Sequence, residues 1–412
     1  MNKLPFVLLL AMMLAGCGDG AGPVAETSTT TPDIAPAESP VFGQLQPEPT
    51  GVIETLPADY PNHWVIVQDA SFFHMSDGKF IVVDAASDDV AGRVKGMFNA
   101  GFIANFYQAK TRPEFYIVET YRSRGTRGER TEVLTIYDKT SLAPTGEVVI
   151  PPKRVSGMPT LYHLQLVDEE RTAVIYNFTP ATSVSVVDVV NREFLNEIPI
   201  PGCSLVYPMA GRAFASLCTD GTMIGVQIGD GGVQTSMSKT EVFFDANNDP
   251  IMEKAAIIDG IAYFPTFLAR MIPVDLNGSE PVVGEEWSLL GDGDEGWRPG
   301  GIQVTGVDDA GRLYVMMHPD GYEGSHKDPG TQVWVYDVET QERVQRIELA
   351  MPVISMGMTV GDDPYLVGTN VNLQVDVYSV ATGEHLRTPV SYTHLRAHET
   401  LRYRVCRLVG EK

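Results

Sequence analysis

A short unit recurs along this chain, and its spacing constrains the fold more than any other feature. Each copy has two or three apolar or β-branched residues, usually followed by an Asp and a polar turn. Counted at the Asp or its equivalent, the seven copies fall at Asp84, Asp138, Asp188, Ile228, Asp275, Asp337 and Ser379. Their spacings are 54, 50, 40, 47, 62 and 42 residues, as expected for one four-stranded propeller blade per copy. The repeat therefore predicts an all-β fold, a seven-bladed β-propeller.

Composition and turn chemistry agree with a fold of strands and tight turns. The chain is 43% hydrophobic, enough to bury a large core, and its 39 Gly and 28 Pro can supply many turns. Asp-Gly pairs, which favour hairpin turns, separate apolar runs at Asp77-Gly78, Asp220-Gly221, Asp259-Gly260 and Asp320-Gly321. Tandem β-sandwiches are the alternative, but no linker-like break interrupts residues 60–390. We expect residues 59–390 to form the propeller.

Residues 1–17 have the pattern of a lipoprotein-type signal peptide. A charged Lys3 precedes a short apolar run, and Leu14-Ala15-Gly16-Cys17 resembles a bacterial lipobox. Cleavage before Cys17 would leave its thiol free for lipid attachment. The alternative is an ordinary secretory signal with an incidental Cys. In both cases the sequence predicts export, and with lipidation at Cys17 it predicts a periplasmic protein that contacts a membrane through its lipid anchor only.

The segment after the signal peptide differs in composition from the rest of the chain. Residues 18–58 are rich in Pro, Ala, Thr and Glu and contain no Lys or Arg. Such a segment cannot bury enough apolar surface to fold by itself. We therefore expect residues 18–58 to be a disordered tether between the anchor and the propeller.

Export also changes how the cysteines are interpreted. Cys203 and Cys218 flank apolar runs that contain Pro208 and Gly211, a pattern typical of two antiparallel strands. Disulfides persist in oxidising compartments, so we predict a bond between Cys203 and Cys218. The alternative is a pair of buried free thiols. The chain has no Cys-x-x-Cys-His sequence, which argues against covalent c-type haem.

Motifs that would carry chemistry are missing from the sequence. The eight His show neither His-x-His nor His-Glu-x-x-His spacing, so no metal site is predicted. There is no Gly-x-Ser-x-Gly elbow, and the acidic runs at 245–249 and 291–295 fit solvated turns better than calcium loops. A formal net charge of −23 argues against nucleic acid and anionic lipid headgroups as partners. These residues indicate a scaffold rather than a self-sufficient enzyme.

Three segments carry a resemblance to a known family. They are the Arg-rich stretch Tyr121–Thr131, the sequence Gly296-Trp297-Arg298-Pro299-Gly300-Gly301, and the pair Cys203 and Cys218 followed by Thr219-Asp220-Gly221. In this order and spacing they resemble the heavy subunit of the quinoprotein amine dehydrogenases, the methylamine and aromatic amine dehydrogenase family. The resemblance extends over residues 64–390 and implies a seven-bladed propeller.

The resemblance implies that the chemistry belongs to a partner. Two heavy and two light subunits would assemble, and the light subunit would hold tryptophan tryptophylquinone made from its own Trp residues. This chain would then hold no cofactor and no catalytic residue. The complex would convert a primary amine to an aldehyde plus ammonia and pass electrons to a blue copper protein or a cytochrome c. The heavy subunit would position the light subunit and help form the substrate channel.

Individual residues within the resemblance have competing interpretations. Phe73, in the stretch 68–74, matches the family position of an aromatic at the channel mouth, where it would select amines by size; the alternative is inter-blade core. Trp297 fits loop packing better than substrate contact. The four arginines of 122–130 fit a solvated or inter-subunit salt-bridge face better than an anion site.

The C-terminal end departs from the family pattern. Residues 391–412 break the strand pattern and carry five Lys/Arg against two Glu. They resemble translated sequencing-adapter sequence, so we predict a non-native tail; a genuine basic tail lying on the light subunit is the alternative. Only one strand, residues 386–390, is expected between Ser379 and this tail. The last blade is therefore predicted to be incomplete.

Two other functions remain compatible with a propeller of this kind. One is a lipid-anchored binding or scaffold protein without amine chemistry. The other is a lactonase-type hydrolase, which would need a cluster of Asp, Asn and Glu metal ligands facing the central channel. Scattered carboxylates at strand edges do not establish such a cluster, so the amine dehydrogenase heavy subunit is the favoured interpretation.

Overall fold

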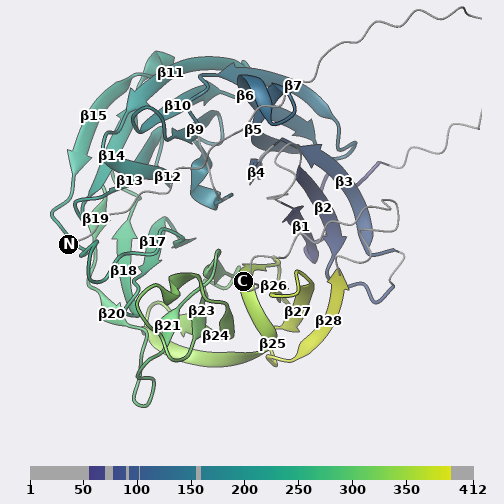
Figure 1. Ribbon diagram of the computed structural model, residues 1–412, viewed down its shortest axis with the longest axis vertical. Coiled ribbons are helices and arrows are strands. Elements are labelled where there is room, and N and C mark those ends of the chain that lie inside the picture. Colours follow the sequence, from purple (N-terminus) through teal and green to yellow (C-terminus); the bar gives the residue numbers. More distant parts are fainter. Residues whose placement is uncertain (1–54, 70–77, 90–91, 102, 155–158, 391–412) are drawn as a thin grey trace, which may run out of the picture. The chain divides into compact units, whose positions relative to one another are not determined.

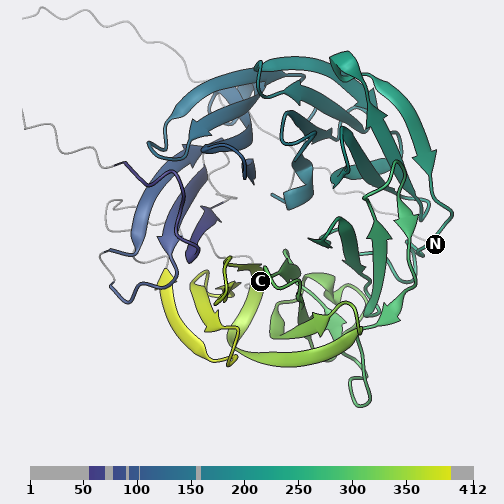
Figure 2. The same cartoon turned by 180° about the vertical axis from the view of Figure 1, so that it is seen from behind.

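β-Sheets follow one another around a ring, in the order of the sequence (Figure 1), and Figure 2 shows the same ring from behind. The computed structural model describes residues 55–69, 78–89, 92–101, 103–154 and 159–390. In these residues the regular structure is strands and three short 3₁₀ turns, namely η1 (Leu161–His163), η2 (Asp230–Gly232) and η3 (Ser325–Lys327). The fold is an all-β β-propeller, as the repeat predicted.

The first half of the ring consists of four sheets, and neighbouring strands in each are antiparallel. The first has three strands, β1 (Trp64–Asp69), β2 (Gly78–Asp84) and β3 (Val94–Ala100). The second has β4 (Asn105–Gln108), β5 (Glu114–Arg124), β6 (Arg127–Asp138) and β7 (Pro144–Ile150). The third has β8 (Leu164–Val167), β9 (Thr172–Asn177), β10 (Ser183–Asp188) and β11 (Glu193–Pro199). The fourth has β12 (Cys203–Met209), β13 (Ala213–Cys218), β14 (Met223–Ile228) and β15 (Gln234–Lys239).

The second half consists of a five-stranded and an eight-stranded sheet. The five-stranded sheet has β16 (Ala256–Ile258), β17 (Ile261–Pro265), β18 (Arg270–Asp275), β19 (Val282–Val283) and β20 (Trp287–Ser288). The eight-stranded sheet has β21 (Arg298–Pro299), β22 (Thr305–Val307), β23 (Leu313–His318), β24 (Gly330–Asp337), β25 (Glu342–Met358), β26 (Tyr365–Asn370), β27 (Val375–Ser379) and β28 (His385–Val390). Hydrogen bonding thus gives six sheets, not seven separate ones.

The long strand β25 explains why the last sheet has eight strands. Its N-terminal part pairs with β24, with Glu348 opposite Gln332. Its C-terminal part pairs with β26, with Met358 opposite Leu366. The register shifts near Val353, where one pairing gives way to the other. One continuous strand therefore joins a group of five strands, β21–β24 and the first part of β25, to a group of four, the second part of β25 and β26–β28.

The Asp recurs because it ends a strand and forms hydrogen bonds with the turn that follows. Asp84, Asp138, Asp188, Asp275 and Asp337 are the last residues of β2, β6, β10, β18 and β24. Their carboxylates accept hydrogen bonds from backbone N–H groups of the following turn, as when Asp138 Oδ1 accepts from Thr140 N at 3.0 Å. Short polar side chains that bond their own turn in this way end a strand efficiently. The repeat thus marks the point where a strand turns toward the outer edge of its sheet.

The apolar runs before these Asp residues are buried on both faces. In β10, which ends at Asp188, every residue before the Asp is buried, and so is every residue of the neighbouring strand β9, because each sheet packs between two neighbours. At the outer edge, β15 is mostly exposed, so its sequence is polar. Between the first two sheets, four phenylalanines pack against one another, with ring centroids of contacting pairs 4.9–5.4 Å apart: Phe80, Phe98, Phe115 and the partly buried Phe106. Each buried Phe contributes about 1.5–3 kcal/mol.

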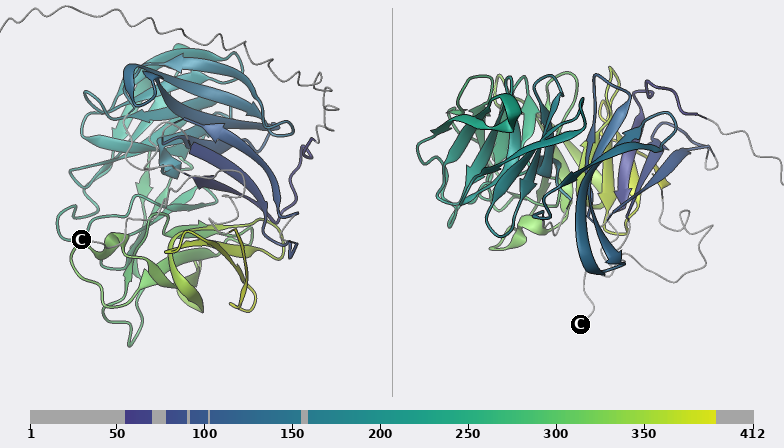
Figure 3. Two further views of the ribbon diagram at one scale, coloured as in Figure 1. Left: turned by 45° about the vertical axis from the view of Figure 1, so that its right-hand side comes forward. Right: turned by 90° about the horizontal axis from the view of Figure 1, so that it is seen from above.

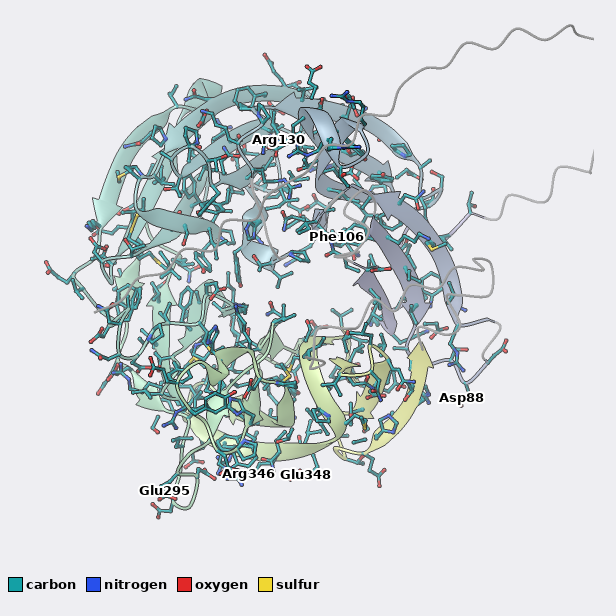
Figure 4. All side chains as sticks on the ribbon, in the orientation of Figure 1. Asp88, Phe106, Arg130, Glu295, Arg346 and Glu348 are labelled. Carbon is teal, nitrogen blue, oxygen red and sulfur yellow. A yellow bond between two sulfur atoms is a disulfide. The ribbon has the colours of Figure 1, made fainter. Side chains whose placement is uncertain are left out.

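The first and last sheets meet at a seam of apolar contacts and side-chain hydrogen bonds. Ile81 and Val83 of β2 share a core cluster with Val375 and Val377 of β27. Arg93 Nη1 donates to the carbonyl of Pro389 at 2.7 Å. Across the same seam, Arg387 of β28 donates to Asp88 Oδ1 and to Ala85 O, each at 2.9 Å; Figure 4 labels Asp88 beside β28.

Two predictions made from the sequence differ from the structure of the described residues. The last group of strands, from the second part of β25 to β28, has four members, whereas the first sheet, β1–β3, has three. Among the described residues, the strand that we predicted to be missing from the last blade is therefore missing from the first sheet, on the other side of the seam. The pair Asp320-Gly321 does not make a tight hairpin, because the connection from β23 to β24 runs through η3. By contrast, Asp259-Gly260 joins β16 to β17 with positive φ at both residues.

Candidate partner-docking surface

The predicted site residues fall both inside and outside the described chain. Cys17 and Phe73 lie outside the described residues. Cys203 and Cys218 form a disulfide with an S–S distance of 2.02 Å. They lie directly opposite each other where β12 pairs with β13. The pairing predicted from export and strand pattern is therefore present, and it closes one end of the fourth sheet.

Trp297 packs in a loop, as its sequence context predicted, and the structure adds ion pairs that hold this loop. Its ring centroid lies 5.2 Å from that of Trp334, which is fully buried. The guanidinium groups of Arg343 and Arg346 lie 4.2 and 4.6 Å from the Trp334 ring centroid. Both arginines pair with Asp294, whose side chain is 2% exposed. The Trp334 ring is therefore covered by Trp297 and by the two arginines.

The Arg-rich stretch lies at the tip of a hairpin that extends past its own sheet. β5 and β6 are 11 and 12 residues long, whereas β4 has only 4 residues and pairs with residues 115–118 of β5. On the other side, β7 pairs with β6 only from Glu132 onward. Residues 119–131 therefore lie in a two-stranded ribbon with which no other strand of the described residues pairs. In the right-hand view of Figure 3, this blue hairpin projects beyond the ends of the other strands.

The tip of this hairpin carries concentrated positive charge. Arg122 lies opposite Arg130, and Arg124 opposite Arg127. Arg122, Arg124 and Arg127 are exposed, and no carboxylate of the described residues forms an ion pair with them. Only Arg130, labelled in Figure 4, pairs with a carboxylate, that of Glu132, at 3.5 Å. Like charges opposite each other on paired strands destabilise the pairing.

A buried ionic cluster holds the base of the hairpin. Glu119 on β5 and Glu132 on β6 are both fully buried. Arg154, 3% exposed, donates from its guanidinium to Asn105 Oδ1 at 2.8 Å and to Thr120 Oγ1 at 2.7 Å. Its backbone N–H donates to Glu132 Oε2 at 2.8 Å. Both strands of the hairpin are therefore connected to the adjoining chain through one arginine.

The pKa values in this cluster reflect its burial. Burial raises the pKa of Glu119, against hydrogen bonds from Thr135 and from the Gly101 N–H. Burial likewise raises the pKa of Glu132, against the backbone N–H and the charge of Arg154. Burial lowers the pKa of Arg154 to about 10, although both carboxylates act in the opposite direction. Arg154 is still charged at neutral pH, so the cluster needs all of its hydrogen bonds.

Other polar groups are structural in character. His163 in η1 is buried; burial and then the charge of Arg154 lower its pKa to about 4. Among the residues with described positions, no three His, Cys, Asp or Glu are grouped so that they could hold a metal ion. In the same part of the chain, no helix is long and apolar enough to span a membrane.

Sequence reasoning missed the cluster at the hairpin base. Glu119 and Glu132 directly adjoin apolar runs, in the sequences Tyr116-Ile117-Val118-Glu119 and Glu132-Val133-Leu134. An acidic residue within a doubly buried strand must find a partner, and this was the available signal. The partner, Arg154, comes from a separate segment after β7, so only the fold brings the three together.

A ring of stacked sheets, with a basic hairpin projecting from it, defines the protein as a β-propeller. Comparison with known proteins identifies the family. The model of the methylamine dehydrogenase heavy chain family matches residues 62–394. The chain therefore belongs to the methylamine dehydrogenase heavy chain family, as the three sequence segments had indicated.

Individual relatives are distant but similar along most of their length. The chain is 27% identical to a methylamine dehydrogenase heavy chain of Paracoccus versutus, over 79% of this chain and 76% of the relative. It is also 27% identical to one of Methylorubrum extorquens, over 91% and 87%. Among solved structures, dihydro-heme d1 dehydrogenase NirN aligns with a TM-score of 0.49 and 14% identity, over 83% of this chain and 67% of that one. That last likeness is too weak to bear on function.

Proposed function

We propose that this chain is the heavy subunit of a periplasmic amine dehydrogenase, docking a light subunit that bears tryptophan tryptophylquinone. The family match over residues 62–394 is the observation that carries the proposal. The light-subunit quinone would supply the oxidation of a primary amine to an aldehyde plus ammonia. Electrons would pass on to a blue copper protein or a cytochrome c, and two heavy and two light chains would form the complex.

The role of this chain in that complex is to bind and to position. A stack of hydrogen-bonded sheets would present its loops with little rearrangement on binding, which would keep the cost of docking low. Phe73 is proposed to line the substrate channel, where an aromatic side chain would restrict amines by size. Cys17 is proposed to carry the lipid anchor that keeps the complex at a membrane surface.

We also propose that the propeller has seven blades. The eight-stranded sheet then counts as two blades that share β25, because the two parts of β25 pair with different neighbours. Seven strands end at the recurring positions, namely β2, β6, β10, β14, β18, β24 and β27. A fourth strand pairing with β1 would complete the first blade.

Co-expression tests the proposed function. The chain purified alone is expected to show neither quinone absorbance nor amine-dependent dye reduction. Co-expression with a light subunit encoded nearby, together with the proteins that mature its quinone, is expected to produce both. Amine oxidation by the isolated chain, or the lack of any encoded light subunit, would contradict the proposal and favour a scaffold without amine chemistry.

A further inference from the structure

We propose that the tip of the β5–β6 hairpin, residues 121–131, is an electrostatic docking element for a carboxylate-rich face of the light subunit. The proposal rests on the proposed function, since it names the surface by which this chain would hold its partner. It is carried by three observations, which are the overhang of the hairpin, the pairing of its arginines and the rigidity of its base.

The overhang makes the tip accessible. Neither β4 nor β7 reaches residues 119–131, so no strand of the described residues pairs with either edge of this ribbon. Isolated two-stranded ribbons are marginally stable in water. A projecting ribbon of this length therefore needs support from its base, from a partner, or from both.

The positive charge of the tip favours a partner that has carboxylates on its surface. Residues 121–131 contain four arginines and one glutamate in a chain of net charge −23. The facing pairs Arg122–Arg130 and Arg124–Arg127 repel each other in the free chain. Carboxylates of a partner would relieve this repulsion and could accept paired hydrogen bonds from each guanidinium. Tyr121, 42% exposed, adds a residue type that is enriched at protein interfaces.

The base of the hairpin fixes its direction before binding. Arg154 connects Glu132 and Thr120 on the two strands to Asn105 of β4. Thr135 donates to Glu119 across the two strands, and Gly101 N donates to the same carboxylate at 2.7 Å. A surface that is held in its bound orientation loses less entropy on association.

The light subunit suits this tip better than a second copy of the chain. Two copies each carry a net charge of −23 and therefore repel each other at long range. Anionic lipid headgroups meet the same repulsion from the acidic body of the chain. A smaller partner with one acidic face can reach the hairpin without bringing two acidic bodies together.

The test uses the co-expressed complex and two matched variants of this chain. The hairpin variant is Arg122→Gln/Arg124→Gln/Arg127→Gln. The control variant, Lys110→Gln/Arg171→Gln/Lys327→Gln, removes the same number of exposed positive charges elsewhere on the ring. The dissociation constant between heavy and light chains is measured by dilution and mass photometry at about 50 mM and about 300 mM NaCl.

The hairpin variant is expected to raise the dissociation constant roughly tenfold at low salt, and the difference should shrink at high salt. The control variant should bind like the original chain. Equal binding by all three chains would overturn the docking element and leave the proposed function standing. No complex with the original chain would overturn both.

Two further outcomes would assign the tip to another occupant. The first is self-association of the original chain without any light subunit, which is lost in the hairpin variant. The second is binding to phosphatidylglycerol-containing vesicles that depends on the three arginines while the complex is unchanged. Either result would overturn the proposal, because the hairpin would then serve a second copy or a lipid surface.

Discussion

Replacing Asp294 by Asn is expected to destabilise the protein by about 2 kcal/mol. Asp294 Oδ2 accepts from the Gly291 N–H at 2.9 Å and from Arg343 at 2.7 Å, and Oδ1 accepts from Arg346. Breaking a buried ion pair costs about 3–5 kcal/mol. Here the carboxylate is 2% exposed but the two arginine side chains are 21% and 37% exposed. Solvent screens arginines exposed to that extent, which lowers the expected cost.

Differential scanning calorimetry of Asp294→Asn can measure this effect. The unfolding entropy of about 2 cal/mol/K per residue, over about 330 propeller residues, converts about 2 kcal/mol into a fall in Tm of about 3 °C. Asp292→Asn is the matched control, because Asp292 is an exposed residue of the same loop. Equal Tm values for the two variants would refute the reasoning, since they would show that the ion pairs over Trp334 contribute no net stability.

Three other predictions follow from features of the ring. Cys203→Ser/Cys218→Ser is expected to lower the free energy of unfolding by about 3 kcal/mol, because the bond closes a loop of 15 residues, and urea titration will measure it. The folded pKa of His163, about 4, lies below its ordinary value of 6.5, so its stabilising contribution is present above pH 6.5 and is lost as the pH falls toward 4. His163→Gln should therefore reduce the slope of Tm against pH in that window, and an unchanged slope would contradict the assignment. Arg93→Ala should accelerate hydrogen exchange in β28 more than in β26, as mass spectrometry of the exchanged protein will show, because only β28 loses the hydrogen bond across the seam.

Local sequence rules predicted the architecture well because a propeller is built from local hairpins. The recurring Asp ends its strand by bonding the next turn, so its spacing along the sequence follows the spacing of the sheets. Asp259-Gly260 likewise determines its own turn. Asp320-Gly321 fails as a hairpin signal because the next strand, β24, begins only at Gly330, after η3. A turn dipeptide indicates the local backbone conformation, but it does not indicate where the next strand begins.

The candidate docking surface was harder to predict, because it depends on where the neighbouring strands β4 and β7 end. The sequence showed an Arg-rich link before an apolar strand, whereas the structure has Arg127 already within β6. That difference arises because β5 and β6 continue to pair with each other out to Arg124 and Arg127, beyond the reach of β4 and β7. The role of Arg154 also depends on tertiary contacts. Phe73 lies outside the described residues, so its place in the substrate channel remains a prediction from the family resemblance.

The shared strand β25 has a consequence for how this family can change in evolution. Elsewhere in the ring, successive sheets are joined by connecting segments, which tolerate insertions and deletions. Between the last two groups of strands, the connection is backbone that pairs with β24 on one side and β26 on the other. Deleting one residue around 350–352 would reverse the faces of every following position in β25. Length variation is therefore expected to be rare at that point and common at the other junctions.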